Sequence, residues 1–307
     1  MPDSRKPERN ERSCITFEEW LHYAEGRFRR ARLVFGHGTD NAFDEAAWLL
    51  LHVAKHSYDD LAGALTRVLT TPQRRRALAL IEARVATHKP LAHLLHEAWL
   101  GDRRFYVDER VIVPRSHIAE LLRDGLRPWI RSRTQVQAAL DMCTGSGCLA
   151  VLLALAYPRT RVDAVDVSAP ALAVARRNVK DYGLTSRVRL VRSDLFDKMN
   201  GTRYDVIVAN PPYVDAKGMS RLPREYRLEP RLALAGGRDG LDFVRRIIGD
   251  ARRHLSARGV LVVEIGHNRA VLERAYPGLA FTWLQTGAGG DYVFLLGRDE
   301  LPPGSTS

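Results

Sequence analysis

The motif N-P-P-Y at residues 210–213 carries the most specific chemistry in this sequence. It follows Tyr204 to Ala209, an apolar, β-branched run that is typical of a buried strand. The two prolines end the strand because neither can donate a backbone hydrogen bond, and they disfavour a helical conformation at the preceding Asn210. The asparagine amide offers one acceptor and two donors, and the Tyr213 ring offers a flat face. We therefore expect a stiff corner, called the N-P-P-Y corner below, that can hold a planar group bearing NH2.

A second motif lies at an earlier, glycine-rich turn. Leu140 to Cys148 (L-D-M-C-T-G-S-G-C) leads from a predicted strand into a predicted helix. Gly145 and Gly147 let the backbone approach a ligand closely, and the helix start offers free N–H groups to a carboxylate. Asp166 ends the next strand, where it can accept hydrogen bonds from both ribose hydroxyls. Asp194, after the third strand, can accept from an adenine amino group. Alone it would equally be a cap or turn residue, but the series predicts a nucleoside cofactor.

This order of motifs resembles the class I S-adenosylmethionine-dependent methyltransferases, in the branch that methylates planar amino or amide nitrogens. A dinucleotide-dependent dehydrogenase prefers G-x-G-x-x-G, and Ala150 is permitted in the third glycine position, but the N-P-P-Y corner argues against that class. The resemblance implies S-adenosylmethionine as the cofactor. The residues expected to bind it are Asp141, Cys143, Thr144, Gly145, Ser146, Gly147, Asp166, Asp194, Leu195 and Asn210.

The N-P-P-Y corner also meets a chemical requirement of amide methylation. An amide nitrogen is a poor nucleophile because its lone pair is delocalised into the carbonyl. The Asn210 side-chain oxygen and the Pro211 carbonyl can accept the two N–H hydrogens, and both hydrogen bonds strengthen as positive charge develops on nitrogen. The Tyr213 ring can hold the amide plane toward the methyl group. We therefore expect Asn210, Pro211 and Tyr213 to be catalytic; the alternative is a rigid structural turn.

Two further stretches resemble the protein N(5)-glutamine methyltransferases. Leu228 to Leu241 is similar to the family segment E-P-x-x-A-L-x-G-G-x-D-G-L, which lies beside the substrate site. Val111 to Leu121 is similar to a block of the branch that methylates large-subunit ribosomal protein L-three; Ser116 fits this branch, whereas the release-factor branch carries V-P-R-P. The resemblance covers about residues 90–296 and departs at His117 and His93, where proline and tyrosine are usual. It implies that Asn210, Pro211, Pro212, Tyr213 and Glu229 bind the glutamine; plain packing is the alternative for Glu229.

Several functions stay open on the residues alone. The leading hypothesis is methyl transfer to the side-chain amide nitrogen of a glutamine in ribosomal protein L-three. The alternatives are a release-factor glutamine methyltransferase and an exocyclic-amine methyltransferase that flips adenine out of DNA or rRNA. No target-recognition domain is evident for the second alternative. A catalytically inactive assembly factor is disfavoured by the intact Asn210 and Tyr213.

The elements that must position these motifs follow from the hydrophobic pattern. Alternating strands and helices from Ala138 onward predict an α/β, Rossmann-like class I methyltransferase domain over residues 114–307, with a mostly parallel seven-stranded sheet whose last two strands are antiparallel. Residues 1–91 predict a small helical domain that begins with a capping box at Thr16. Residues 92–113 predict a β-hairpin connector that turns at Gly101-Asp102. Residues 1–13 and 302–307 have the composition of disordered ends.

Composition narrows the possible partners. The formal net charge is +11, which fits either an arginine-rich proteome or a surface that meets rRNA near an assembling ribosomal particle. Cys14, Cys143 and Cys148 have neither zinc nor disulfide spacing, and His52 and His56 lack the glutamate of H-E-x-x-H, so we expect no metal. No apolar run approaches the roughly 18 residues of a membrane span, and the N-terminus lacks a signal-peptide core, so we expect a cytoplasmic protein without a membrane partner.

Overall fold

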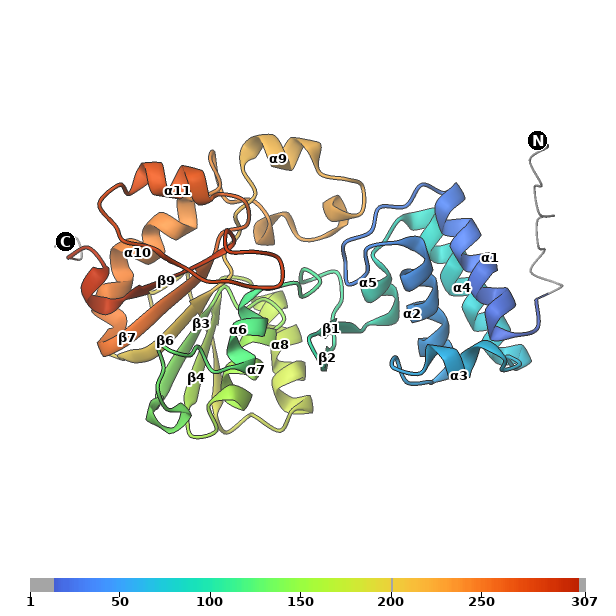
Figure 1. Ribbon diagram of the computed structural model, residues 1–307, viewed down its shortest axis with the longest axis horizontal. Helices are drawn as coiled ribbons and strands as arrows, with labels where there is room; N and C mark the ends of the chain where they lie inside the picture. The colour runs from blue at the N-terminus through green and yellow to red at the C-terminus, as the bar shows by residue number, and fades with distance from the viewer. Residues whose placement is uncertain (1–13, 200, 304–307) are drawn as a thin grey trace. The chain divides into compact units, whose positions relative to one another are not determined.

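The chain folds into two compact units in the computed structural model, which describes residues 14–199 and 201–303 (Figure 1). The first unit, called the helical unit, contains the chain up to Glu97 together with Pro223–Leu228. The second contains Ala98–Leu222 and the chain from Glu229 onward; it is called the catalytic unit because it carries the N-P-P-Y corner that is expected to be catalytic. The sequence-based boundaries at residues 91 and 113 differ from this division, and the inclusion of Pro223–Leu228 in the helical unit was not expected. The predicted disorder of residues 1–13 and 304–307 falls outside the described residues.

The described residues of the helical unit form five α-helices: α1 (Phe17–Arg30), α2 (Ala42–Ala54), α3 (Leu61–Leu65), α4 (Thr71–Thr87) and α5 (Leu91–Leu95). The predicted capping box is present at α1, where the Thr16 hydroxyl accepts from the Glu19 N–H and the Glu19 carboxylate accepts from the Thr16 N–H. Thr70 and Gln73 form a second capping box at α4. The short helix α5 was not predicted.

The catalytic unit is organised around a seven-stranded sheet. Its strands are β3 (Ala138–Met142), β4 (Arg161–Asp166), β5 (Val188–Arg192), β6 (Tyr204–Ala209), β7 (Leu255–Glu264), β8 (Thr282–Trp283) and β9 (Val293–Gly297). The strand order is β5-β4-β3-β6-β7-β9-β8. The neighbouring strands from β5 to β7 are parallel, and β9 is antiparallel to both β7 and β8. The predicted fold class is confirmed.

Helices cover both faces of this sheet (Figure 1). The helices of this unit are α6 (Ile118–Arg123), α7 (Cys148–Ala156), α8 (Ala169–Asp181), α9 (Ala216–Arg221), α10 (Asp242–His254) and α11 (Arg269–Ala275). Side chains of β6 alternate between two cores, since Val206 and Val208 pack with α7 residues while Ile207 packs with α10 residues. The predicted hairpin is formed by β1 (Ala98–Leu100) and β2 (Arg103–Phe105). The helix α9 was not predicted.

The register of the sheet brings the carboxyl ends of the central strands level. Met142 at the end of β3 lies opposite Ala209 at the end of β6 and opposite Val165 in β4. Asp166 at the end of β4 lies opposite Arg192 at the end of β5. The residues that follow these strands therefore meet at one edge of the sheet, where open α/β sheets bind their ligands. Among the described helices, none combines the length and apolarity required to cross a membrane.

Candidate active site

The glycine turn after β3 needs its glycines for two different reasons. Gly147 precedes α7 with φ +79°, and a Cβ at this position would lie 2.9 Å from the Ala175 Cβ of α8. Gly147 thus lets two helices approach each other. Gly145 has φ +55°, and a Cβ there would meet no atom within 4 Å. The space beside Gly145 is therefore open for a ligand that lies against the backbone.

Two aspartates, Asp141 and Asp166, accept hydrogen bonds from this turn. Each carboxylate oxygen of Asp166 accepts one backbone hydrogen bond, from the Gly145 N–H at 2.9 Å and from the Ser168 N–H at 2.8 Å, while burial raises its pKa. Asp141 is fully buried and accepts from the Thr144 hydroxyl at 2.5 Å; burial raises its pKa to about 7. Asp141 therefore supports the turn, whereas Asp166 lines the pocket described next and keeps lone pairs for further hydrogen bonds.

A pocket opens at this edge of the sheet, within the catalytic unit. The sequence-predicted residues that line it are Cys143, Gly145, Asp166, Asp194, Leu195, Asn210 and Pro212. Its other lining residues include Arg110, Val111, Ile112, Pro230, Leu232 and Phe243. The predicted residues outside this lining are Asp141, Thr144, Ser146, Gly147, Pro211, Tyr213 and Glu229. The structure thus brings the three proposed cofactor motifs and the N-P-P-Y corner to one cavity.

Arg110 and Phe243 are two of the lining residues that the sequence did not predict. Among the described residues of the lining, Arg110 is the only lysine or arginine, and its Nε donates to Asp108 at 2.9 Å. Its position in the V-D-E-R-V-I-V-P block was a usable signal, because that block was already tied to the family. Phe243, in the first turn of α10, carries no comparable signal. Since Arg110 Nη2 also donates to Asp108, at 2.5 Å, Arg110 lines the pocket as one half of an ion pair, together with Asp166 and Asp194.

Asp194 is not isolated at the pocket rim. Its Oδ1 lies 3.0 Å from the Arg246 Nη1 of α10, and both side chains are nearly half exposed. Such an exposed pair adds little stability. That hydrogen bond uses only one carboxylate oxygen of Asp194, so the geometry leaves the other oxygen for the predicted adenine contact, which stays a prediction.

The N-P-P-Y corner is packed against glycines from three later positions. A Cβ at Gly236 would lie 2.7 Å from the Pro212 carbonyl oxygen, and one at Gly240 would lie 2.4 Å from the Tyr213 carbonyl oxygen. A Cβ at Gly266 would lie 2.7 Å from the Tyr213 ring. The glycines of the G-G-x-D-G-L segment therefore let the backbone of the corner pack closely against it.

Backbone hydrogen bonds join the corner to the segment that follows Glu229. The Val214 N–H donates to the Leu234 carbonyl at 2.9 Å, and the Gly236 N–H donates to the Val214 carbonyl at 2.8 Å. These bonds accompany a parallel bridge between Val214 and Ala235. In addition, the Asn268 amide donates to the Tyr213 carbonyl at 2.8 Å. The two stretches that the family resemblance paired as reaction site and substrate segment are thus physically adjacent.

Glu229 is buried and paired. Its carboxylate accepts from the Arg115 guanidinium at 2.7 and 2.6 Å, and from the Val113 N–H at 2.8 Å. This bidentate pair ties the substrate segment to the V-P-R-S block. Direct binding of a glutamine by Glu229 stays a prediction. The contacts favour a role in which Glu229 fixes the position of Arg115.

Ser116, the residue that separated the two family branches, also has a buried partner. Its hydroxyl donates to the Glu264 carboxylate at 2.6 Å, and the His117 N–H donates to the same oxygen at 2.9 Å. Burial raises the pKa of Glu264 to about 7. A proline in place of Ser116 would have neither a hydroxyl nor a backbone N–H.

The remaining cysteines and histidines have structural surroundings. Burial raises the pKa of the Cys143 thiol and raises that of Cys148 to about 12, so both thiols are protonated. His52 lies 3.5 Å from Glu97 and His56 lies 3.1 Å from Asp60. Across residues 14–199 and 201–303, no group of three or more potential ligands could hold a metal ion.

Comparisons with known proteins agree with this geometry. The family model described as "Methyltransferase small domain" matches residues 126–222, and the one described as "PrmC N-terminal domain" matches residues 19–95. A solved structure of the hMettl16 catalytic domain in complex with the MAT2A 3'UTR hairpin 6 has a TM-score of 0.50 and 16% identity, and the match covers 79% of this chain and 87% of that one. At this identity the match supports the fold alone.

Curated relatives cover nearly the whole chain. Proteins named "Ribosomal protein uL3 glutamine methyltransferase" are 56% identical in Neisseria meningitidis serogroup B (93% of this chain, 94% of the relative) and 52% identical in Bordetella pertussis (95% and 98%). A protein of the same name in Bradyrhizobium diazoefficiens is 46% identical (94% and 92%). The family expected from the sequence is confirmed: the chain belongs to the ribosomal protein uL3 glutamine methyltransferases.

Proposed function

We propose that this chain transfers a methyl group from S-adenosylmethionine to the side-chain amide nitrogen of a glutamine in ribosomal protein uL3. The observation that carries this proposal is the convergence of the glycine turn, Asp166, Asp194 and Asn210 on one pocket, with the Tyr213 backbone packed on the segment after Glu229. The names of the relatives support the substrate, and their agreement favours uL3 over a release factor.

The pocket has the properties that S-adenosylmethionine requires. When bound, this cofactor supplies an electrophilic methyl group. We assign its binding to the predicted set, in which Gly145 leaves open space and Asp166 keeps acceptor capacity for the ribose hydroxyls. Asp141, Thr144, Ser146 and Gly147 lie outside the pocket lining and shape the turn: Thr144 donates to Asp141, the Ser146 carbonyl accepts from Asn178, and Gly147 lets α7 approach α8. Arg110 provides a guanidinium that can pair with the cofactor carboxylate.

The N-P-P-Y corner activates and orients the amide. The Asn210 side-chain oxygen and the Pro211 carbonyl accept hydrogen bonds from the substrate NH2 group, and these bonds strengthen as the nitrogen becomes positive. Tyr213 restricts the amide plane, and its own position is set by the contact with Gly266 and by the Asn268 amide. Both prolines reduce the freedom of the backbone that carries these groups.

The variant Asn210→Ala tests this assignment. We expect methyl transfer to uL3 to fall by about 10²–10³-fold, as for removal of one positioned hydrogen-bonding group that acts in the transition state. Isothermal titration with S-adenosylhomocysteine should give a dissociation constant within about threefold of wild type, since the other proposed cofactor ligands remain. Retention of more than a tenth of the activity would remove Asn210 from the mechanism.

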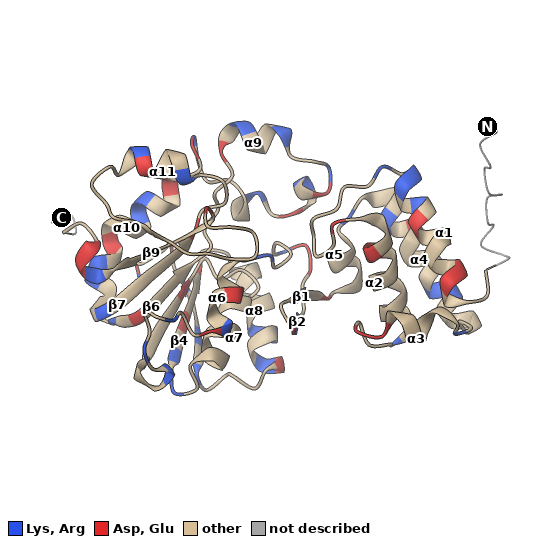
Figure 2. Cartoon of the chain, in the orientation of Figure 1, with Lys and Arg blue, Asp and Glu red and all other residues tan. Residues whose placement is uncertain are grey.

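The substrate class has a separate test. We propose that the protein works in the cytoplasm on uL3, either free or in an assembling particle near rRNA. Lys and Arg occur on helices of both units, α4 and α10 among them (Figure 2), which is compatible with nearby RNA. Incubation with labelled cofactor and uL3, release factor or naked rRNA separates the alternatives. Label in uL3 that disappears on replacement of one glutamine is the expected result; label in RNA would support adenine methylation instead.

A further inference from the structure

Residues Pro223–Leu228, called the anchor segment here, belong to a different unit from the chain on either side of them. Leu222 and Glu229 are part of the catalytic unit, whereas the anchor segment packs with the helical unit. It lies between the N-P-P-Y corner, which ends at Tyr213, and the substrate segment, which begins at Glu229. The helical unit therefore holds the middle of the chain that joins the two proposed substrate-binding stretches.

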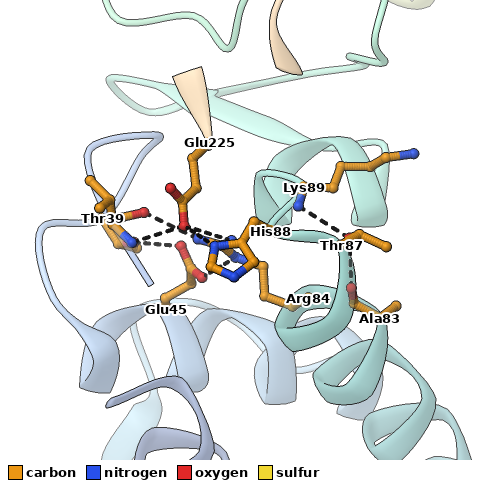
Figure 3. A network of polar contacts seen from close by, with 9 residues as sticks. Thr39, Glu45, Ala83, Arg84, Thr87, His88, Lys89 and Glu225 are labelled. Carbon is orange, nitrogen blue, oxygen red and sulfur yellow. Dashed lines mark hydrogen bonds and ion pairs between the residues drawn. The ribbon is translucent and has the colours of Figure 1, made fainter. Parts of the chain in front are cut away.

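Glu225 makes the central contact of the anchor segment (Figure 3). Its side chain is 1% exposed, and its Oε1 accepts from the Val34 N–H at 3.0 Å. The same oxygen lies 2.9 Å from the His88 Nδ1 and 3.6 Å from the Arg84 Nη1. Burial opposes ionisation of this carboxyl, but these partners outweigh it, and the pKa of Glu225 lies below its usual value. The carboxylate is thus charged and held from three directions.

Arg84 connects this carboxylate to the core of the helical unit. Its side chain is fully buried; Nε donates to Glu45 of α2 at 2.7 Å, and Nη2 donates to the Val34 carbonyl at 3.2 Å. The guanidinium thus lies between two buried carboxylates, Glu45 and Glu225, as Figure 3 shows. A buried cation of this kind needs its partners, because the charge has no access to water.

Tyr226 provides a second and independent contact. Gly36 has φ +120°, and a Cβ there would lie 2.3 Å from the Tyr226 hydroxyl. The ring of His37 lies 4.2 Å from the Tyr226 ring, centroid to centroid. The loop between α1 and α2 thus leaves space that Tyr226 fills. Two adjacent residues of the anchor segment therefore contact the helical unit in different ways: Glu225 through ion pairs and hydrogen bonds, and Tyr226 through packing of its ring.

We propose that Glu225 is a positioning residue for substrate binding, and that the helical unit acts as an anchor for the chain between the N-P-P-Y corner and Glu229. This inference rests on the proposed function, since it takes those two stretches as the substrate site. A loop that is already ordered loses less conformational freedom when a protein substrate binds. The ordering cost is met during folding of the helical unit, so the anchor lowers the KM for uL3 without touching the cofactor.

The variants Glu225→Ala and Glu225→Gln test the anchor, with Glu82→Ala as matched control. Glu82 belongs to the same unit, but it and its ion-pair partner Arg27 (2.8 Å) are 46% and 30% exposed, whereas Glu225 is 1% exposed. Arg224 and Arg227 are exposed and flank Glu225, so trypsin reports on the anchor segment directly. For Glu225→Ala we expect cleavage after these arginines to accelerate at least about tenfold, because release of the segment makes it accessible.

The kinetic readout separates positioning from chemistry. For Glu225→Ala we expect the KM for uL3 to rise at least about tenfold, with kcat and the dissociation constant of S-adenosylhomocysteine each within about threefold of wild type. Glu225→Gln keeps an acceptor for the Val34 N–H but loses the charge toward Arg84 and His88, so an intermediate KM is expected. Tyr226→Ala leaves the ionic contacts intact and should raise the KM by a smaller factor.

Two results would overturn the proposal. One is a KM within threefold of wild type in a Glu225→Ala enzyme whose anchor segment is cleaved faster; the other is unchanged cleavage. Far-ultraviolet circular dichroism of each variant shows whether the helical unit is still folded. If Glu225→Ala unfolds it, the KM of the Tyr226→Ala enzyme for uL3 decides between the proposal and its rejection. If Asn210→Ala stays active while Glu225→Ala raises the KM, the mechanism fails and the anchor stands. If Asn210→Ala is inactive and Glu225→Ala has the wild-type KM, the mechanism stands and the anchor proposal fails.

Discussion

Glu225 and Glu229 are four residues apart in sequence, and each is buried and faces an arginine, yet they belong to different units. Glu229 makes a bidentate pair with Arg115 at 2.6 and 2.7 Å, inside the catalytic unit. Glu225 lies farther from Arg84, at 3.6 Å, and shares its oxygen with Val34 and His88 in the helical unit. The comparison teaches that two neighbouring glutamates of one short stretch form ion pairs in different units: Glu225 in the helical unit and Glu229 in the catalytic unit.

The largest effect is expected at the tighter pair. Glu229→Ala would leave the Arg115 guanidinium and the buried Val113 N–H without their partner, at about 4 kcal/mol of unfolding free energy. Urea unfolding measures this loss. Arg115→Ala and the double variant complete a cycle. If Glu229 acts by holding Arg115, both single variants and the double variant lose similar activity. If Glu229 contacts the glutamine directly, Glu229→Ala loses activity whereas Arg115→Ala keeps it.

A smaller loss is expected at the looser pair. In Glu225→Ala the Arg84 guanidinium keeps Glu45, so we expect about 2–3 kcal/mol, below the usual cost of breaking a buried pair. Because the pKa of Glu225 is lowered in the fold, its contribution is present above the ordinary carboxyl range and is lost as the pH falls through the folded-state value. Urea unfolding of wild type and variant from pH 7 down to pH 3 should show the two stabilities converging. A constant difference would show that the charge of Glu225 contributes nothing.

Glu264 extends the comparison to a buried carboxyl whose hydrogen bonds come from uncharged donors, Ser116 and His117. Burial raises its pKa from 4.5 to about 7, so the folded chain binds the extra proton. Its favourable contribution is complete below about pH 4.5 and is lost as the pH rises through 7, by about 3 kcal/mol. Glu264→Gln should flatten stability between pH 5 and 8 in urea titrations. An unchanged pH profile would contradict the raised pKa.

The smallest effect is expected where the pair is partly open to solvent. Glu82→Ala breaks the pair with Arg27 at the surface of α4, and we expect less than about 0.5 kcal/mol. Thermal unfolding beside Glu225→Ala measures both in one series. Equal losses of stability in the two variants would contradict the expected difference between the buried Glu225 and the partly exposed Glu82.

Local signals account for the parts of the fold that were predictable. The bounds of β3, α7 and β6 agree with the sequence reading, because an apolar run between turn residues is encoded within one element. The helices α5 and α9 are five and six residues long, too short for a helical period to stand out. The site followed the same rule: Asp166 and Asn210 end strands and were found, whereas Arg110 and Phe243 reach the pocket from other elements and were not.

The sequence by itself determined the reaction chemistry and the family, because the N-P-P-Y corner, the glycine turn and the strand-ending acids each carry their meaning in a few consecutive residues. Only the tertiary structure decided which carboxylates are buried and which groups form hydrogen bonds or ion pairs with them. Glu229 meets Val113 across 116 residues and Glu225 meets Val34 across 191. The burial and charge of a carboxylate depend on the groups that folding brings around it, and no local spacing encodes those groups.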